Sequence, residues 1–440
     1  MLQGLLAEVE RIPTEIYCGH VTSLVGGLIE VMGPREKSFI GGACEINTKN
    51  NTSIKAEVVG FRDNKTLLMP FSSMEGVGPG SKVHFLGYEY AAFPDQSWLG
   101  RVINAFGESI DHHGPLKLGP WRYPLKSPPI PAHERAMVGE RLDLGVRVMN
   151  TFLPSCLGQR MGIFAGSGVG KSVFMGQFAR HAKADVIVIG LIGERGREVK
   201  EFISHALGDE GLKKSVLIVS TSDEPALMRR QAAYMTLAVA EYFRDQGFQV
   251  LCLMDSVTRF AMALREIGLA VGEPTASKGY TPTVFSELPK LLERAGPGRE
   301  ESNPKYITGL FTVLVEGDDH NEPVADTVRG ILDGHIVLER AIAERGRFPA
   351  INLLKSVSRT LPGCHNAEEN GLIQRARNLL ATYENMAEMI RLGVYKVGSD
   401  PKIDEAIHYY EPLEKFIAQS IEETKSIEES FTELQSILKA

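Results

Sequence analysis

The chain has 440 residues, enough for two or three domains, and its 43% apolar and 23% charged residues are typical of a globular protein. Its net charge of −7 argues mildly against a protein that coats nucleic acid, although it does not exclude a local basic groove. Five dispersed cysteines without CxxC spacing exclude a zinc site and a disulfide framework, and no stretch has the length of a membrane-spanning helix or the pattern of a signal peptide. We therefore expect a reduced, cytoplasmic protein.

The N-terminal part of the chain changes its pattern at Pro13. Before it, apolar residues recur at helical spacing, which predicts an amphipathic helix over residues 1–13. This helix could bind a partner or pack on its own domain. From 14 to 88, short alternating runs such as "SIKAEVVGF" and "TLLMPF" are separated by turns. They predict a small, closed β-barrel domain.

The middle of the chain alternates strands with helices. A proline-rich, extended linker follows ("GPWRYPLKSPPIPAHE"). After it, continuous apolar runs predict buried strands at 161–165, 186–192, 216–220, 250–254 and 309–315. Helical patterns separate the first four, which indicates a parallel sheet covered on both faces. We expect this α/β domain over 89–362 and a helical domain without strands over 363–440.

The loop "AGSGVGKS" (165–172) lies between the first of these strands and a helix. Glycines allow successive backbone N–H groups to point at phosphate oxygens, and the helix dipole favours the negative charge. Lys171 is predicted to reach the β- and γ-phosphates of a nucleotide, and Ser172 to bind Mg²⁺. Ala165 replaces the usual first glycine. The predicted nucleotide-binding residues in this loop are Gly166, Ser167, Gly168, Val169, Gly170, Lys171, Ser172 and Val173.

Two acids follow later strands of the same predicted sheet. Asp255 comes after "VLCLM", where an acid suits an indirect contact with Mg²⁺ through water; the alternative is a helix N-cap. Glu194 lies in "GLIGERGREV", after the strand that follows the phosphate-loop helix. There it could orient and polarise the water that attacks the γ-phosphate, whereas the alternative is an ordinary helix start, to which Arg197 and Glu198 would also belong.

Six separated motifs occur in the order found in one family: "AGSGVGKS", "GERGREV", "MDSVTRFA", "EGDDHNEPVAD", "DGHIVLERAIAERGRFPAI" and "SVSRT". Together they resemble the hexameric ATPases of type III protein export, relatives of the rotary ATP synthase α and β subunits, and are most similar to the flagellar branch. The likeness is strong from about Gly100 to Leu361 and looser at both ends. It implies a RecA-like P-loop core between a β-barrel and an α-helical domain.

The resemblance also implies roles for individual residues. Glu194 matches the general base and Asp255 the Walker B acid, while Arg195 and Arg259 match arginines near the γ-phosphate. Phe348 stands where the family usually has a tyrosine that stacks on adenine, so stacking is expected to survive without the hydroxyl. Arg359 matches an arginine finger that acts on a neighbouring subunit's site; from physics alone it could equally form a surface ion pair.

The family further implies Mg²⁺-dependent ATP hydrolysis by a homohexamer at the inner-membrane export apparatus. Its implied partners are an elongated negative regulator at the N-terminal helix, a stalk protein, chaperone–substrate complexes and the membrane export gate. An injectisome ATPase is the main alternative. A rotary ATP synthase subunit, a subunit that binds ATP only structurally, and an RNA-translocating hexameric helicase are less favoured. The helicase is disfavoured because the β-domain lacks the basic and aromatic residues that stack on single strands, so no nucleic-acid partner is expected.

Overall fold

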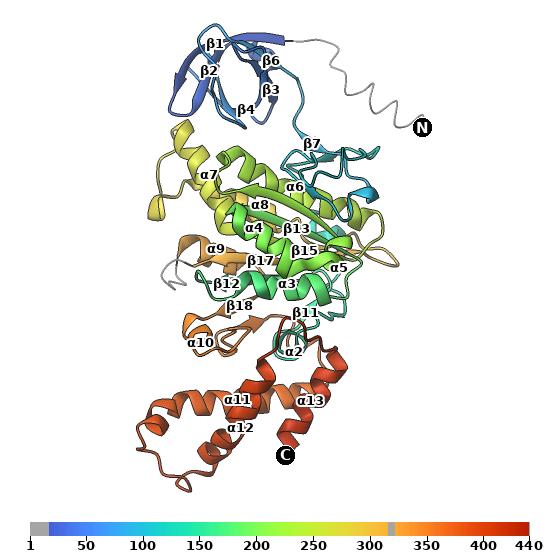
Figure 1. Cartoon of the computed structure of the whole chain (residues 1–440), viewed down its shortest axis with the longest axis vertical. Coiled ribbons are helices and arrows are strands. Elements are labelled where there is room, and N and C mark those ends of the chain that lie inside the picture. The colour runs from blue at the N-terminus through green and yellow to red at the C-terminus, as the bar shows by residue number, and fades with distance from the viewer. Residues whose placement is uncertain (1–16, 316–321, 440) are drawn as a thin grey trace.

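The computed structural model describes residues 17–315 and 322–439, arranged in three parts along one long axis (Figure 1). A β-barrel lies at one end, an α/β domain in the middle, and a group of helices at the other end. The predicted N-terminal helix over 1–13 lies outside the described residues. Among those described, no helix is both long and apolar enough to cross a membrane.

The barrel closes from six antiparallel strands in the order β1-β2-β5-β4-β3-β6. Alternate side chains of these strands point inward and form a separate apolar core that includes Ile29, Ile46 and Leu68. The closed β-domain expected from the sequence is therefore confirmed. Its strands are β1 (Tyr17–Val25), β2 (Leu28–Met32), β3 (Ala43–Asn47), β4 (Ser53–Arg62), β5 (Lys65–Pro70) and β6 (Lys82–Phe85).

The middle domain is built on a nine-stranded sheet whose central strands are parallel, in the order β19-β18-β12-β17-β15-β13-β14-β8 with β16 paired to β17. All five predicted apolar runs lie in it. The strands are β8 (Val102–Ile103), β12 (Arg160–Ala165), β13 (Val186–Glu194), β14 (Ser215–Thr221), β15 (Val250–Asp255), β16 (Gly296–Pro297), β17 (Tyr306–Leu314), β18 (Gly334–Leu338) and β19 (Val357–Ser358).

Helices cover both faces of this sheet, as the continuous apolar strands require. One apolar core joins one face to α6 (Ala226–Asp245), α7 (Val257–Val271), α8 (Pro282–Leu292) and α9 (Pro323–Ile331). A second core joins the other face to α2 (Arg147–Thr151), α3 (Lys171–His181) and the C-terminal helices. The short elements nearby are α4 (Gly196–Glu201), a π-helical turn (Phe202–Leu207), α5 (Gly208–Lys213), α10 (Arg340–Glu344), β7 (Ala91–Ala92), β9 (Tyr123–Pro124), β10 (Arg141–Leu142) and β11 (Ser155–Cys156).

The C-terminal part consists of α11 (Ala367–Arg391), α12 (Pro401–Ile417) and α13 (Ile427–Lys439), with no strand among its described residues. Asn366 caps α11 by accepting a hydrogen bond from the backbone N–H of Glu369, whose side chain bonds back to Asn366. The fold class expected from the sequence, a P-loop core between a barrel and a helical domain, is confirmed.

A buried ion pair joins the barrel to the middle domain. Glu57 on β4 binds the guanidinium of Arg230 on α6 and, at 3.2 Å, the Lys126 Nζ. Glu57 is 4% exposed and Arg230 is 6% exposed. Burial alone would raise the pKa of Glu57, but the charges and hydrogen bonds of Arg230 and Lys126 together hold it below its ordinary value.

Replacing Arg230 by methionine should destabilise the protein by about 3–5 kcal/mol, because Glu57 would remain charged in a buried site without its main partner. Urea unfolding measures the change. The matched control is Lys213→Met, which removes an exposed lysine from its pair with Glu210 and should cost no more than about 1 kcal/mol. Equal stability of the two variants would contradict the structural role of the buried pair.

Candidate nucleotide site

The glycine-rich loop leaves the carboxyl end of β12 and turns directly into α3. Ala165 is the last residue of β12 and is fully buried, so this small residue fits the position usually held by glycine. Gly170 has a φ of +87° and stands at the N-cap of α3, where a Cβ would come within 3.2 Å of the Phe348 ring. Only glycine adopts this conformation without strain. The N-terminus of α3 therefore opens toward the loop, as an anion site requires.

A cavity of about 650 Å³ lies over this loop. It brings most of the predicted loop residues together with Glu194, Arg195 and Arg259. Val169 differs, because its side chain is 1% exposed and packs in the apolar core beneath the loop. The cavity is lined by Gly166, Ser167, Gly168, Gly170, Lys171, Ser172, Val173, Glu194, Arg195, Glu198, Thr258, Arg259, Met262, Leu314, Val315 and Arg340.

Lys171 stands between two carboxylates at the base of the cavity. Its Nζ lies 2.5 Å from Asp255 Oδ1 and 3.9 Å from Glu194 Oε1. The three side chains are only 10%, 3% and 14% exposed, respectively. The lysine thus pairs closely with Asp255 and more loosely with Glu194 in a largely desolvated place, and it lies where an incoming phosphate can compete for it.

Glu194 is the last residue of β13, two residues beyond the end predicted from its apolar run. The strand continues because the pairing with β14 shifts register after Ile192, and Glu194 then pairs with Thr221. Gly193, at φ +68°, forms the irregularity and leaves room for the Arg259 side chain, which a Cβ would approach to 2.9 Å. Glu194 lies immediately before Arg195, the N-cap of α4, and therefore outside the first turn of that helix, whereas Arg197 and Glu198 lie within it.

The environment of Glu194 favours its protonated form in the absence of a ligand. Burial and the nearby charge of Asp255 raise its pKa from 4.5 to about 8, against the opposing effect of Lys171. Its Oε1 is buried without a hydrogen-bond partner among the described residues. A buried carboxyl oxygen that lacks a hydrogen-bond partner and borders a cavity can hold a water there, and once the group has lost its proton, the raised pKa makes the carboxylate a stronger base.

Asp255 ends β15 and is 2% exposed. The alternative in which it caps the following helix is wrong, because Ser256 is the N-cap of α7 and its side chain accepts from the Arg259 N–H. Besides Lys171, Asp255 Oδ1 accepts a hydrogen bond of 2.7 Å from Thr312 on the neighbouring strand β17. Sequence reasoning missed this threonine, since nothing local in "GLFTVLV" distinguishes a supporting hydroxyl from a core residue.

The arginines around the cavity differ in their exposure and in their contacts. Arg195 is 79% exposed and only loosely paired with Glu198 at 3.8 Å. Arg259 packs on Gly193, and its Nε is buried without a hydrogen-bond partner among the described residues. Arg340, which the sequence analysis did not single out, donates to the Ser167 carbonyl at 3.2 Å. It follows β18, so the rule that ligands bind at the carboxyl edge of such a sheet could have found it.

Phe348 lies beside the loop, 45% exposed, with its ring against Gly170. This is a suitable place for an aromatic face that stacks on a nucleotide base. Arg359 lies elsewhere. It follows β19, which pairs with the amino end of β18, whereas the phosphate loop follows the carboxyl end of the adjacent strand β12. Arg359 is exposed and does not line the cavity of its own chain.

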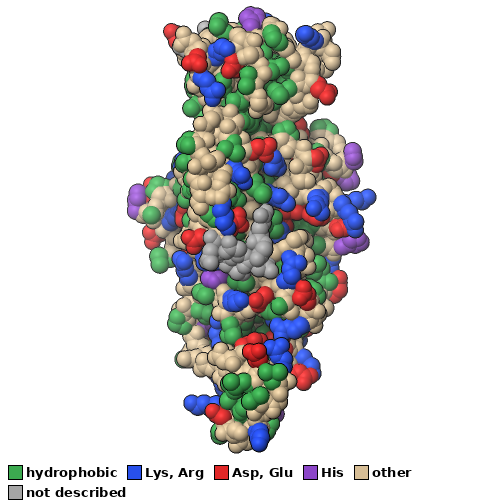
Figure 2. Space-filling model, turned by 90° about the vertical axis from the view of Figure 1, so that its left-hand side faces the viewer, with side chains coloured by type: hydrophobic (Ala, Val, Ile, Leu, Met, Phe, Trp, Pro, Cys, Tyr) green, Lys and Arg blue, Asp and Glu red, His purple; other side chains and the backbone are tan. Residues whose placement is uncertain are grey.

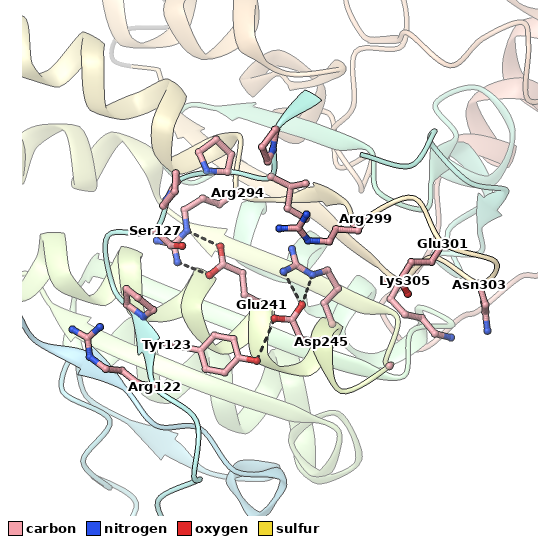
Figure 3. A pocket seen from close by; sticks show the side chains of 18 residues that line it. Arg122, Tyr123, Ser127, Glu241, Asp245, Arg294, Arg299, Glu301, Asn303 and Lys305 are labelled. Atoms are coloured by element: carbon pink, nitrogen blue, oxygen red, sulfur yellow. Dashed lines mark hydrogen bonds and ion pairs between the residues drawn. The ribbon is translucent and has the colours of Figure 1, made fainter. Parts of the chain in front are cut away.

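A second cavity, of about 750 Å³, lies at the opposite edge of the sheet (Figure 3). Four of its charged groups are held by other residues that line it: Arg294 binds both oxygens of Glu241 at 2.8 Å, and Asp245 accepts from Arg244 and Tyr123. It contains no glycine-rich loop and none of the predicted site residues. Size alone therefore does not identify the site.

Comparisons with known proteins match the three parts of the chain. Residues 21–87 match the ATP synthase alpha/beta family β-barrel domain, 145–358 the nucleotide-binding domain of that family, and 365–436 the T3SS EscN ATPase C-terminal domain. A flagellum-specific ATP synthase of Caulobacter vibrioides is 58% identical over the full length of both chains. The chain belongs to the flagellum-specific ATP synthase and type 3 secretion ATPase family.

Other members of this family are also similar to this chain over nearly its whole length. A type 3 secretion system ATPase of Xanthomonas euvesicatoria is 42% identical over 95% of this chain and 93% of its own. The assembled ATPase EscN of enteropathogenic Escherichia coli is 40% identical, has a TM-score of 0.89, and is matched over 96% of this chain and all of its own. The chain is thus a member of an ATPase family, as its motifs indicated, and the nucleotide-binding character of its core is confirmed.

Proposed function

We propose that this chain hydrolyses ATP as a subunit of a homohexameric ring and so energises the type III export of flagellar proteins. The observation that carries the proposal is the convergence of Lys171, Asp255 and Glu194 at the phosphate loop, within a cavity large enough for a nucleotide. The flagellar assignment is supported by 58% identity to a flagellar relative, against 42% to a secretion one. An injectisome ATPase remains the second candidate because both kinds of relative match nearly the whole chain.

In the proposed reaction the loop N–H groups and Lys171 hold the phosphates. Glu194 orients the attacking water and accepts its proton, while Arg195 and Arg259 stabilise the charge on the transferred phosphoryl group. The proposed role of Phe348 is to stack on the base. The Lys171–Asp255 pair must loosen when phosphate binds, which would free the aspartate carboxylate.

The donor groups fit Mg²⁺, which takes few protein oxygens and completes its octahedron with water and phosphate. Ser172 borders the cavity and would supply a hydroxyl, and the carboxylate of Asp255 would act through water. When bound, the ion would neutralise charge on the phosphates.

We infer an assembly and partners from related structures. EscN has been described as assembled and in complex with its central stalk EscO, and the latter structure matches this chain with a TM-score of 0.87. A surface suited to a stalk or another export partner lies at the turn between α11 and α12 (Figure 2, lower end). Apolar side chains are exposed there by 51–82%: Met389, Leu392, Val394 and Val397.

The proposal extends to the remaining export partners. The N-terminal segment would bind an elongated negative regulator, and the helical domain would meet chaperone–substrate complexes and the export gate. These contacts would hold a cytoplasmic ring at the inner membrane. The full chain, tested for restoring motility to cells that lack their flagellar export ATPase, separates the flagellar role from the injectisome one.

Replacing Lys171 by alanine should weaken ATP binding by about 10- to 150-fold, because a charge-assisted hydrogen bond to phosphate contributes about 1.5–3 kcal/mol. Calorimetric titration with ATP measures the affinity. Lys200→Ala is the matched control, since Lys200 is exposed on α4 and does not border the cavity. An unchanged affinity in Lys171→Ala would refute the phosphate-loop assignment.

A further inference from the structure

The segment between α12 and α13 is fastened to the nucleotide-binding domain at both of its ends. We call residues 418–425 the connector. At its start, Gln419 is 5% exposed among residues of the middle domain. At its end, the Lys425 N–H donates to the Gly145 carbonyl at 3.0 Å, and the Lys425 carbonyl accepts from Asn150 at 2.9 Å.

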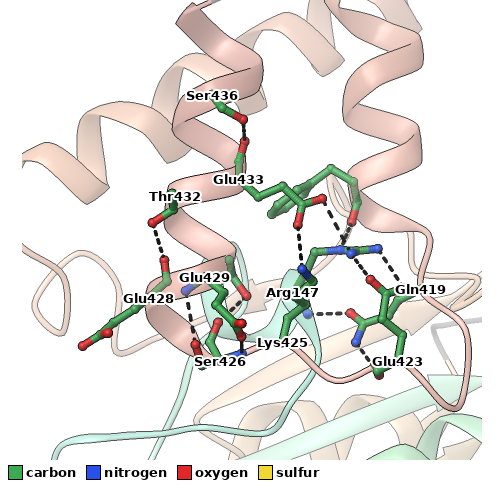
Figure 4. Close-up of polar contacts among 12 residues, drawn as sticks. Arg147, Gln419, Glu423, Lys425, Ser426, Glu428, Glu429, Thr432, Glu433 and Ser436 are labelled. Atoms are coloured by element: carbon green, nitrogen blue, oxygen red, sulfur yellow. Dashed lines mark hydrogen bonds and ion pairs between the residues drawn. The ribbon is translucent and has the colours of Figure 1, made fainter.

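Gln419 is the best-anchored residue of the connector (Figure 4). Its Oε1 accepts from the Arg147 backbone N–H at 2.8 Å. Its Nε2 donates to the carbonyls of Gly145 and Glu423, each at 2.8 Å. The side chain therefore has partners inside the protein for both of its N–H donors and for its oxygen, and these three hydrogen bonds hold it in place.

The backbone of Gln419 extends this anchoring to the predicted base-stacking residue. Its N–H donates to the Phe348 carbonyl at 2.9 Å. The Phe348 ring in turn lies against Gly170, the residue that begins the helix of the phosphate loop. One residue of the C-terminal part of the chain is thus a single hydrogen bond away from Phe348.

The next connector residues contact the phosphate-loop helix itself. Gln177 on α3 donates to the Ser420 carbonyl at 2.9 Å, and the His181 ring lies 3.0 Å from the Ile421 carbonyl. Arg147 also holds the connector, because its guanidinium binds the Ala418 carbonyl and the Glu423 carboxylate. The connector therefore contacts both the helix that binds phosphate and the backbone of Phe348.

We propose that Gln419 is a positioning residue for nucleotide binding: its side-chain hydrogen bonds hold the connector in the place that keeps Phe348 against the base. The inference rests on the proposed function, in which Phe348 stacks on that base. Gln419 does not touch the nucleotide. It acts through the Phe348 backbone, so it should affect recognition of the base and leave recognition of the phosphates unchanged.

The test compares ATP with inorganic tripolyphosphate, which has the phosphates and no base. Gln419→Met keeps the length of the side chain and removes all three of its hydrogen bonds. If the Phe348 ring then lies in its stacking position for about a tenth of the time, the Kd for ATP rises about tenfold. The Kd for tripolyphosphate should not change, and KM for ATP should rise with kcat at saturation preserved. Gln435→Met on α13 is the matched control, because the side chain of Gln435 bonds, among the described residues, only to the exposed Glu368.

A double-mutant cycle with Phe348→Ala separates positioning from general loosening. Phe348→Ala alone should weaken ATP and not tripolyphosphate, and adding Gln419→Met should cause no further loss of ATP affinity. Equal losses for ATP and tripolyphosphate in Gln419→Met, or additive losses in the double variant, would overturn the inference. So would wild-type ATP affinity in Gln419→Met while Phe348→Ala weakens it. If Phe348→Ala itself leaves ATP binding unchanged, the stacking role in the proposed function is what fails.

Discussion

Replacing Glu194 by glutamine should lower kcat for ATP hydrolysis by about 10²–10⁴-fold, the usual contribution of a general base, while ATP affinity changes little. The amide has nearly the shape of the carboxylate and can still contact a water. It cannot accept that water's proton. Phosphate release under saturating ATP measures kcat, and calorimetric titration of the same protein measures binding.

Glu198→Gln is the matched control for Glu194→Gln, because Glu198 borders the same cavity but is 46% exposed. Its turnover should stay within a few-fold of wild type. A Glu194→Gln variant that also hydrolyses ATP at nearly the wild-type rate would remove Glu194 from the mechanism.

The raised pKa of Glu194 gives the same variant a second readout. The nucleotide-free folded chain keeps this proton up to a pH of about 8, whereas the unfolded chain loses it near 4.5. Between these values the folded state binds more protons at Glu194, so the contribution of this group to the free energy of unfolding should fall as pH rises. Glutamine does not titrate. The stability of Glu194→Gln relative to wild type should therefore increase from pH 5 to pH 8, as measured by urea unfolding without nucleotide or metal.

The sequence predicted the elements that follow from local pattern. Strands buried on both faces are continuous apolar runs, so β12, β13, β14, β15 and β17 were found within a few residues of their observed bounds. The phosphate loop could also be recognised from the sequence, because its glycines, lysine and serine stand between a predicted strand and a predicted helix. The last two residues of β13 were missed, since only pairing with Thr221 continues that strand beyond Gly193.

Contacts between distant parts of the chain could not be read from pattern. Thr312 meets Asp255 because β15 and β17 are neighbours, an order that apolar runs alone do not specify. Arg340 reaches Ser167 across 173 residues of sequence. Gln419 lies in a segment whose helical pattern gave no sign of a link to Phe348. Each depends on tertiary packing and not on local propensity.

Arg359 does not border the nucleotide cavity of its own chain. The arginine and the cavity of its own chain lie at opposite edges of one sheet. Its N–H donates to the Asp333 carbonyl at 3.0 Å, which holds the backbone there, and its guanidinium makes one long contact of 3.4 Å with the Arg329 carbonyl. No carboxylate pairs with it among the ion pairs of the described residues. We therefore propose that Arg359 acts on the site of a neighbouring subunit, as the family resemblance implies.

If Arg359 completes a neighbour's site, mixing two inactive variants should restore activity. Specific ATPase activity of the wild type should rise steeply with protein concentration as subunits associate. Arg359→Ala should lose that rise and still bind ATP, because an arginine finger contributes about 10³–10⁵ in rate by stabilising the transition state. Lys171→Ala should lose activity for a different reason, because its own phosphate loop binds ATP weakly. In a mixed ring, an Arg359→Ala subunit with an intact loop can meet a Lys171→Ala neighbour with an intact arginine.

Such boundaries should recover a measurable fraction of wild-type turnover. The control mixes Lys171→Ala with the double variant Lys171→Ala/Arg359→Ala, in which no subunit has an intact loop and no recovery is expected. Light scattering or native mass measurement establishes that mixed rings have formed. If the mixture of Arg359→Ala and Lys171→Ala shows no ATPase activity although mixed rings have formed, Arg359 acts within its own chain. The reaction would then need another source for the positive charge that neutralises the transferred phosphoryl group.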